Sequence, residues 1–117
     1  MRAILIDPKA KQITQIDYNG DYKTIYEHLS NSHKVRAFDI VRIPVGNDGI
    51  YVDDEGLFVP NEDKHWFTYR YNAHEMHQNI PLVNRGLIIG CDENGDSVDC
   101  DSTVDSIKPQ ITWGLVR

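Results

Sequence analysis

The chain has 117 residues, which suits one domain with a single core, since a fold of this size removes roughly two thirds of its unfolded surface from water. Its 12 Lys and Arg stand against 18 Asp and Glu, and the net charge of -6 excludes undirected binding to nucleic acid or anionic lipid. No apolar run approaches the roughly 20 residues of a membrane-spanning helix, and the start lacks a signal-peptide core, so we expect a cytoplasmic protein.

The first third of the chain predicts a β-hairpin followed by a helix. Residues 2–7 and 12–18 are β-rich apolar runs on either side of a polar turn that begins at Asp7-Pro8. A helix is expected over about 21–30, where the Asp21 side chain can cap the amides of the first turn. The helix face that should pack on a sheet carries Tyr22, Ile25, Tyr26 and Leu29.

The middle of the chain predicts three strands and an acidic turn. Strands are expected over 37–45, 50–54 and 57–60, separated by glycine-containing turns. The last of these turns carries three adjacent acids, Asp53, Asp54 and Glu55. We interpret them as a solvated turn tip. A magnesium or calcium site is the alternative, although neighbouring strand residues point to opposite faces and do not converge on an ion.

The rest of the chain predicts a strand, a helical turn, a hairpin and a closing strand. Within residues 64–79 we expect a strand up to Tyr71 and then a helical turn. Asn94-Gly95 is a two-residue turn signal for the hairpin that follows. Ser102, with Asp105 three residues later, can start a short helical turn before a last strand at 111–116.

These elements predict one α+β domain over residues 1–117. We expect a mostly antiparallel sheet built from hairpins, with one main helix at about 21–30 and a short second helical turn.

Three histidines raise the question of a metal site. His74 and His77 are three residues apart, whereas the His-Glu-x-x-His motif of metallopeptidases needs a spacing of four on one helix face. A shared metal would also need a third ligand, such as His65. We expect solvent-exposed histidines and no bound metal.

The two cysteines are expected to be free thiols. With Asn94-Gly95 as the turn, Cys91 lies opposite Val98 and Cys100 lies opposite Ile89, so the thiols share a face as diagonal neighbours. Their Cα atoms would then be about 7 to 8 Å apart, too far for a disulfide.

The acid-rich segment from Cys91 to Asp105 predicts an anionic patch, because it holds six acids and no base. In the register given above, three of the acids project from one face: Asp92, Asp99 and Asp101. This patch is either a solvated turn or a contact surface for a basic partner.

A second candidate surface combines rings and cations. Trp66, Tyr69 and Arg70, with Arg85 from a later segment, have the composition of a recognition surface for a protein or a stacked base. Core packing of the rings is the alternative, because a small sheet needs aromatic side chains inside.

Three segments carry a resemblance to a known family. They are "MRAILIDPKAKQITQIDYNGDYKTIYEHL", "FDIVRI" with "DGIYVDDEGLF", and "PLVNRGLIIGCDENGD". In this order they resemble a family of small uncharacterised proteins, a domain of unknown function found in bacteriophages, plasmids and other mobile elements. The resemblance implies a setting inside a bacterial host cell, and it implies no catalytic residues.

The sequence favours a non-enzymatic role. It contains no P-loop, no dinucleotide-binding glycine motif and no nucleophile elbow, so we expect no cofactor and no catalysis. The leading hypothesis is an accessory protein that binds and modulates a host protein, for example a defence or nucleic-acid enzyme. The alternative is a small-ligand binder that sequesters a nucleotide-type molecule through the ring and cation surface. A metal-dependent hydrolase using the acidic turn ranks third. Direct contact with nucleic acid or membrane is not expected.

Overall fold

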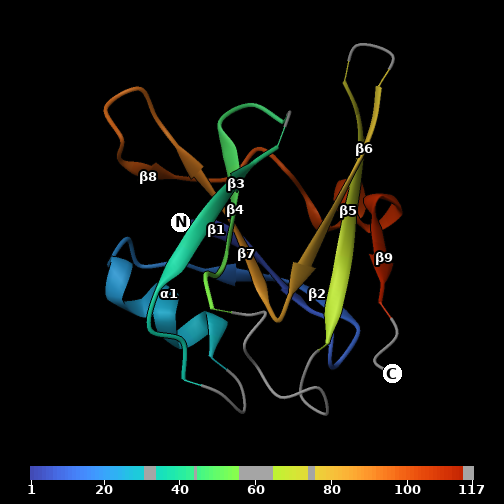
Figure 1. The fold of residues 1–117 in the computed structure, drawn as a ribbon. Coiled ribbons are helices and arrows are strands. Elements are labelled where there is room, and N and C mark those ends of the chain that lie inside the picture. The colour runs from blue at the N-terminus through green and yellow to red at the C-terminus, as the bar shows by residue number, and fades with distance from the viewer. Residues whose placement is uncertain (31–33, 44, 56–64, 74–75, 115–117) are drawn as a thin grey trace.

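The structure is a computed structural model, and it describes residues 1–30, 34–43, 45–55, 65–73 and 76–114, with only the backbone described for 71–73 and 76–80. Its strands form two antiparallel sheets (Figure 1). The large sheet has the order β2-β1-β7-β4-β3, with the short β8 paired to β7, and the small sheet has the order β6-β5-β9.

The large sheet consists of β1 (Arg2–Asp7), β2 (Gln12–Asp17), β3 (Phe38–Arg42), β4 (Asp48–Asp53), β7 (Gly86–Cys91) and β8 (Ser97–Val98). The small sheet consists of β5 (Trp66–Ala73), β6 (Met76–Val83) and β9 (Ile111–Trp113). The expected hairpin of β1 and β2 is confirmed, with Arg2 opposite Asp17 and Asp7 opposite Gln12.

The central strands of the large sheet, β1, β4 and β7, are buried on both faces, which explains their continuous apolar runs. Successive residues of a strand point to opposite sides. On the central strand β7, Ile88 therefore enters one core, while Leu87 and Ile89 enter another on the opposite face. A strand with two covered faces does not show the polar alternation of a half-exposed one.

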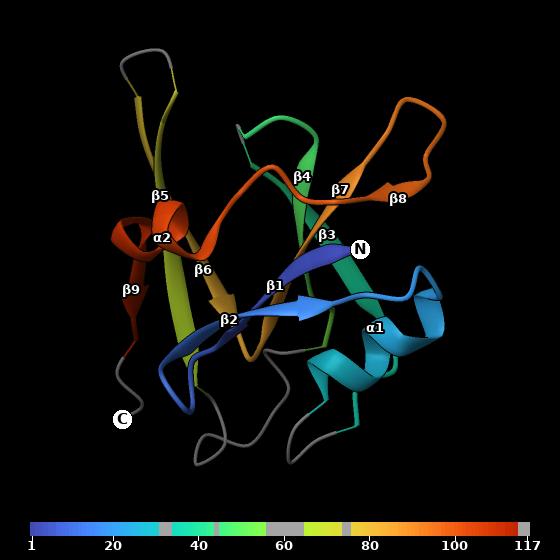
Figure 2. The ribbon, with the colours of Figure 1, turned by 180° about the vertical axis from the view of Figure 1, so that it is seen from behind.

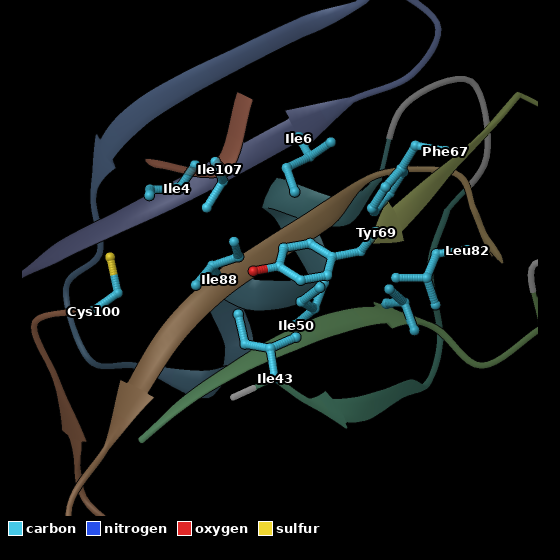
Figure 3. Close-up of a cluster of buried hydrophobic side chains, with 11 residues drawn as sticks. Ile4, Ile6, Ile43, Ile50, Phe67, Tyr69, Leu82, Ile88, Cys100 and Ile107 are labelled. Carbon is cyan, nitrogen blue, oxygen red and sulfur yellow. The ribbon is translucent and has the colours of Figure 1, made fainter. Parts of the chain in front are cut away.

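The core between the two sheets is the larger of these clusters (Figure 3). It is formed by Ile4, Ile6, Ile43, Ile50, Val52, Phe67, Tyr69, Leu82, Ile88, Cys100 and Ile107. Gly86 allows the sheets to approach, because a Cβ at this position would stand 2.8 Å from Cζ of Phe67 and 3.0 Å from Cγ2 of Ile50. The small sheet thus packs against bare backbone at the start of β7.

The other face of the large sheet is covered by helix α1 (Tyr22–Leu29). The Asp21 side chain accepts a hydrogen bond from the Lys23 amide at 3.0 Å, as expected of its cap. Ile25 and Leu29 are buried against the sheet. Tyr22 is 59% exposed, so its predicted place on the packing face is wrong.

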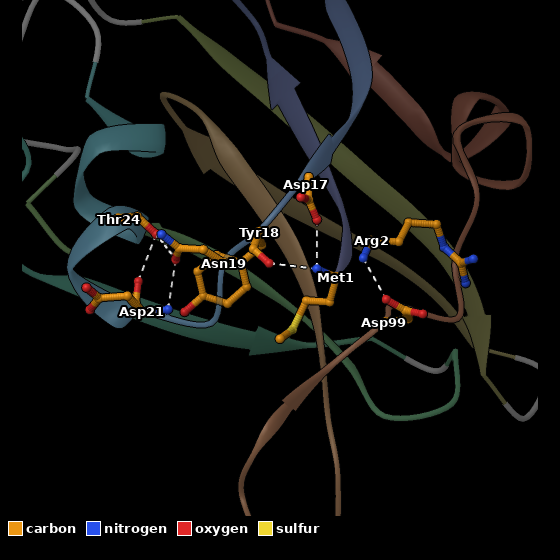
Figure 4. A network of polar contacts seen from close by, with 8 residues as sticks. All are labelled: Met1, Arg2, Asp17, Tyr18, Asn19, Asp21, Thr24 and Asp99. Atoms are coloured by element: carbon orange, nitrogen blue, oxygen red, sulfur yellow. Dashed lines mark hydrogen bonds and ion pairs between the residues drawn. The ribbon is translucent and has the colours of Figure 1, made fainter.

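Polar contacts hold the start of the chain against the end of β2 (Figure 4). The Met1 ammonium donates to Oδ1 of Asp17 at 2.8 Å and to the Tyr18 carbonyl at 2.7 Å. Its hydrogen bond and positive charge lower the pKa of Asp17. β1 and β2 are therefore tied together at the end opposite their turn.

Two expected helical features differ from the structure. The helix at 22–29 is short and does not dominate the fold, since the second helix, α2 (Val104–Ile107), is another brief element beside a 3-10 turn, η3 (Lys108–Gln110). α2 is capped by Thr103 and not by Ser102, because the Thr103 side chain bonds the Ser106 amide and the Ser106 hydroxyl bonds the Thr103 amide.

The helical turn expected after Tyr71 is also wrong. β5 continues to Ala73, and β6 pairs with it from Met76 onward. The strand expected at 57–60 and the end of the one expected at 111–116 lie outside the described residues. No helix in the described ranges is long and apolar enough to cross a bilayer.

Candidate functional site

The predicted ring and cation surface is divided between the two sides of the small sheet. Tyr69 is 2% exposed and lies in the core beside Phe67 (Figure 3). Arg70, the next residue of β5, is exposed and points to the opposite face. Trp66 is half-buried, and a Cβ at Gly114 would stand 2.1 Å from its ring. Tyr69 therefore takes the core role that was the alternative.

Arg85 connects two elements of the fold. Its guanidinium forms an ion pair with Oδ2 of Asp7 at 3.2 Å and donates to the carbonyl oxygens of His28 and Ser30 at 3.3 and 2.8 Å. These contacts join the β1–β2 turn to the end of α1. Arg85 does not share a surface with Tyr69, which is enclosed between the sheets.

The turn of the β7–β8 hairpin differs by one residue from the prediction. The loop has three residues, Glu93 to Gly95, and Gly95 has a φ of +85°. The Gly95 amide bonds the Asp92 carbonyl, and the Asp92 amide bonds the Asp96 carbonyl, which is a type I turn followed by a glycine bulge. A shift of one residue turns every following side chain to the other face.

The cysteines follow this corrected register. Cys91 lies opposite Ser97 and not opposite Val98. Cys100 is buried in the core that contains Ile88, not in the one that contains Ile89, and both thiols are free. Burial raises the pKa of Cys100, with a smaller opposing effect of the Arg2 guanidinium.

The acids of the predicted anionic patch each accept a backbone hydrogen bond. Asp92 accepts from the amides of Asn94 and Asp96 inside its own loop, both at 2.9 Å. Asp99 accepts from the Arg2 amide at 2.6 Å (Figure 4), and Asp101 accepts from the Asn47 amide at 3.3 Å. All three contribute to local structure, and a role in binding a partner stays a prediction.

A buried acid that the sequence did not indicate fastens the same segment. Asp48 is fully buried at the start of β4. Its carboxylate accepts from the amides of Asp101 and Ser102, both at 2.8 Å, and from the Ser102 hydroxyl at 2.6 Å. Between a turn signal and a strand, Asp48 reads as an ordinary turn residue, so no sequence pattern marked it.

His65 is described, His74 is not, and only the backbone of His77 is described, as part of β6. In the described part of the chain, no three His, Cys, Asp or Glu side chains are grouped so that they could hold a metal ion.

The acidic turn at 53–55 borders a cavity. We call this the acidic cavity: it has a volume of about 180 Å³ and is lined by Asp39, Val52, Asp53, Asp54, Pro81, Leu82 and Val83. Asp39 comes from β3, Val52 and Asp53 come from β4, and Asp54 directly follows β4, while the opposite wall at 81–83 comes from β6 of the small sheet. The predicted turn is therefore part of a hollow between the two sheets, which the sequence did not indicate.

The acidic cavity combines an apolar floor with an anionic rim. Val52 and Leu82 are each 7% exposed, and they belong to the core between the sheets. Asp39 and Asp53 each use one carboxylate oxygen to accept a neighbouring amide, from Ile40 at 2.8 Å and from Glu55 at 2.9 Å. Within the described ranges, no basic side chain forms an ion pair with these acids or with Asp54.

Comparisons with known proteins found no protein similar to this chain. No model of a protein family matches it, and neither the curated proteins nor the solved structures contain a match.

Proposed function

We propose that this protein is a non-enzymatic binding protein that docks a basic side chain of another protein into the acidic cavity. The observation that carries the proposal is the placing of Asp39, Asp53 and Asp54 around an apolar floor without a described cationic partner. Lys and Arg side chains have the complementary form, because an apolar stem carries a charged end group.

The size of the cavity supports a single side chain as the occupant. Pockets that enclose drug-sized ligands measure roughly 300 to 1,000 Å³. The acidic cavity, at about 180 Å³, is smaller. An inserted stem would cover Val52 and Leu82, while its cation would meet the free carboxylate oxygens.

The charged rim of the acidic cavity would contribute more to the rate and specificity of binding than to its affinity. Exposed charge pairs are worth about 0.2 to 1 kcal/mol each, and they raise association rates and specificity more than affinity. The net charge of -6 adds a long-range attraction for a basic partner. The resemblance to proteins of phages and plasmids supports a host protein as this partner.

A defined peptide tests the proposal. The probe is a blocked peptide with one Arg between Leu and Val residues, and the comparison peptide carries Gln in place of Arg. Binding is measured by amide shift changes in NMR spectra at 50 mM salt. We expect shifts at the cavity residues with the Arg peptide alone, and weaker binding at 500 mM salt because exposed charges are screened.

Matched variants separate the cavity from general charge. Asp39→Asn keeps an oxygen for the Ile40 amide, and Asp54→Asn removes no hydrogen bond of the described structure. The double variant should bind the Arg peptide roughly 2- to 30-fold more weakly, from two lost pairs. The control pair, Glu93→Gln with Asp96→Asn, changes the same charge in the β7–β8 loop. Equal binding by both pairs, or no binding to the wild type at millimolar peptide, would refute the proposal.

A further inference from the structure

A second cavity lies at another corner of the molecule and has the opposite charge. We call it the cationic cavity: it measures about 230 Å³ and is lined by Lys11, Ile13, Lys108, Ile111 and Trp113. The β1–β2 turn, β2, η3 and β9 contribute these residues, and the turn, η3 and β9 lie on the same side of the molecule (Figure 2). Among the residues that the structure describes, no acid lines this cavity, although acids outnumber bases in the chain by 18 to 12.

The apolar wall of the cationic cavity is continuous with the core. Ile111 and Trp113 are two residues apart on β9, so they share a face of the small sheet, opposite Tyr69 and Phe67 of β5. Together with Ile13 they are partly buried against the core between the sheets. The indole is thus held in place while part of it faces the hollow.

Each of the two lysines lies in a turn whose backbone is held by other residues. Lys11 has a φ of +55° at the end of the β1–β2 turn. Oδ1 of Asp7 accepts the amides of Lys9 and Ala10 at 3.0 and 3.2 Å, and Arg85 holds the same carboxylate. Lys108 begins η3, directly before Pro109. Neither lysine forms an ion pair with a carboxylate of the described chain.

We propose that the cationic cavity binds a small molecule that carries an aromatic ring and an anionic group. The ring would stack on Trp113 beside the two isoleucines, since offset stacking on an indole is favourable. The anion would lie between the ammonium groups of Lys11 and Lys108, which act as point charges for phosphate or carboxylate. At about 230 Å³ this cavity also lies below the range of pockets that enclose drug-sized ligands, so we expect it to enclose one ring and to leave the rest of a larger ligand outside.

Ligand pairs that differ in one feature test this proposal on the whole chain. The aromatic anions are AMP and indole-3-acetate, the neutral ring is adenosine, and the anions without a ring are acetate and inorganic phosphate. Binding is followed by quenching of tryptophan fluorescence and by calorimetry. We expect at least one aromatic anion to bind about tenfold or more tightly than adenosine, acetate or phosphate. AMP alone would identify a phosphate source, and indole-3-acetate alone a carboxylate source.

Lysine variants locate the binding. Lys11→Gln with Lys108→Gln should weaken binding of the aromatic anion about tenfold or more, and Lys11→Arg with Lys108→Arg should restore it to within about threefold. The control pair, Lys23→Gln with Lys34→Gln, removes the same charge at exposed positions outside the cavity. Equal loss in the control pair, equal binding of phosphate and AMP, or no aromatic anion bound at millimolar concentration would overturn the proposal. The result is independent of peptide docking in the acidic cavity.

Discussion

The buried carboxylate of Asp48 gives the sharpest test of what holds this fold together. In Asp48→Asn, the amide oxygen can replace only one of the two carboxylate oxygens. If the oxygen of the new side chain accepts from the amide and hydroxyl of Ser102, the NH2 group of that side chain faces the Asp101 amide. Two hydrogen-bond donors then face each other. One charged hydrogen bond is then lost and two become neutral, which costs about 2 to 4 kcal/mol.

Urea unfolding, followed by circular dichroism, measures this loss as a lower midpoint at unchanged slope. The matched control is Glu93→Gln, which removes one charge from an exposed loop residue and should change the free energy of unfolding by less than about 0.5 kcal/mol. A loss below about 1 kcal/mol for Asp48→Asn, or a loss equal to that of the control, would show that Asp48 does not fasten Asp101 and Ser102 to β4.

Three further predictions concern the cores. Leu29→Ala should lower the free energy of unfolding by about 2 to 4 kcal/mol in urea, because the Leu29 side chain is buried. Tyr22→Ala should lower it by less than about 0.5 kcal/mol, because Tyr22 is 59% exposed. Similar losses in the two variants would contradict the observed orientation of α1. Gly86→Ala should cost about 1 to 3 kcal/mol, since the added methyl meets the Phe67 ring, and an unchanged midpoint would argue against the close approach of the sheets. Burial raises the pKa of Cys100 above its ordinary 9.0, so the stability that it contributes should be complete below pH 9 and fall as the pH rises through the folded value. Cys100→Ala should reduce that alkaline decline, and an identical pH profile would refute the assignment.

Local patterns predicted the fold where the contacts are local. The hairpin of β1 and β2 and the cap at Asp21 follow from adjacent residues, and both are confirmed. The loop at Asn94-Gly95 shows the limit of such patterns. Two-residue and three-residue loops both use a glycine at positive φ, and choosing the wrong one reverses the faces of all the residues that follow.

The candidate sites could not be predicted, because they are made by contacts between distant segments. The acidic cavity joins Asp39 and Asp54 to residues 81–83, and no periodicity connects these positions. Arg85 reads from the sequence as a free cation, but its partners are an acid near the start of the chain and two carbonyl oxygens at the end of α1. Tyr69 reads equally as surface or core until the second sheet is in place.

The place of β7 at the centre of the large sheet has a consequence for synthesis on the ribosome. β7 pairs with β1, where Ile4 meets Ile88, and with β4, where Ile50 meets Ile88. Until residue 91 has emerged, the two earlier hairpins lack the strand that joins them, and their apolar edges stay open. Such distant pairings slow folding and expose nascent chains to aggregation, so we expect an unfinished copy of this protein to aggregate through these edges until β7 is available to pair with them.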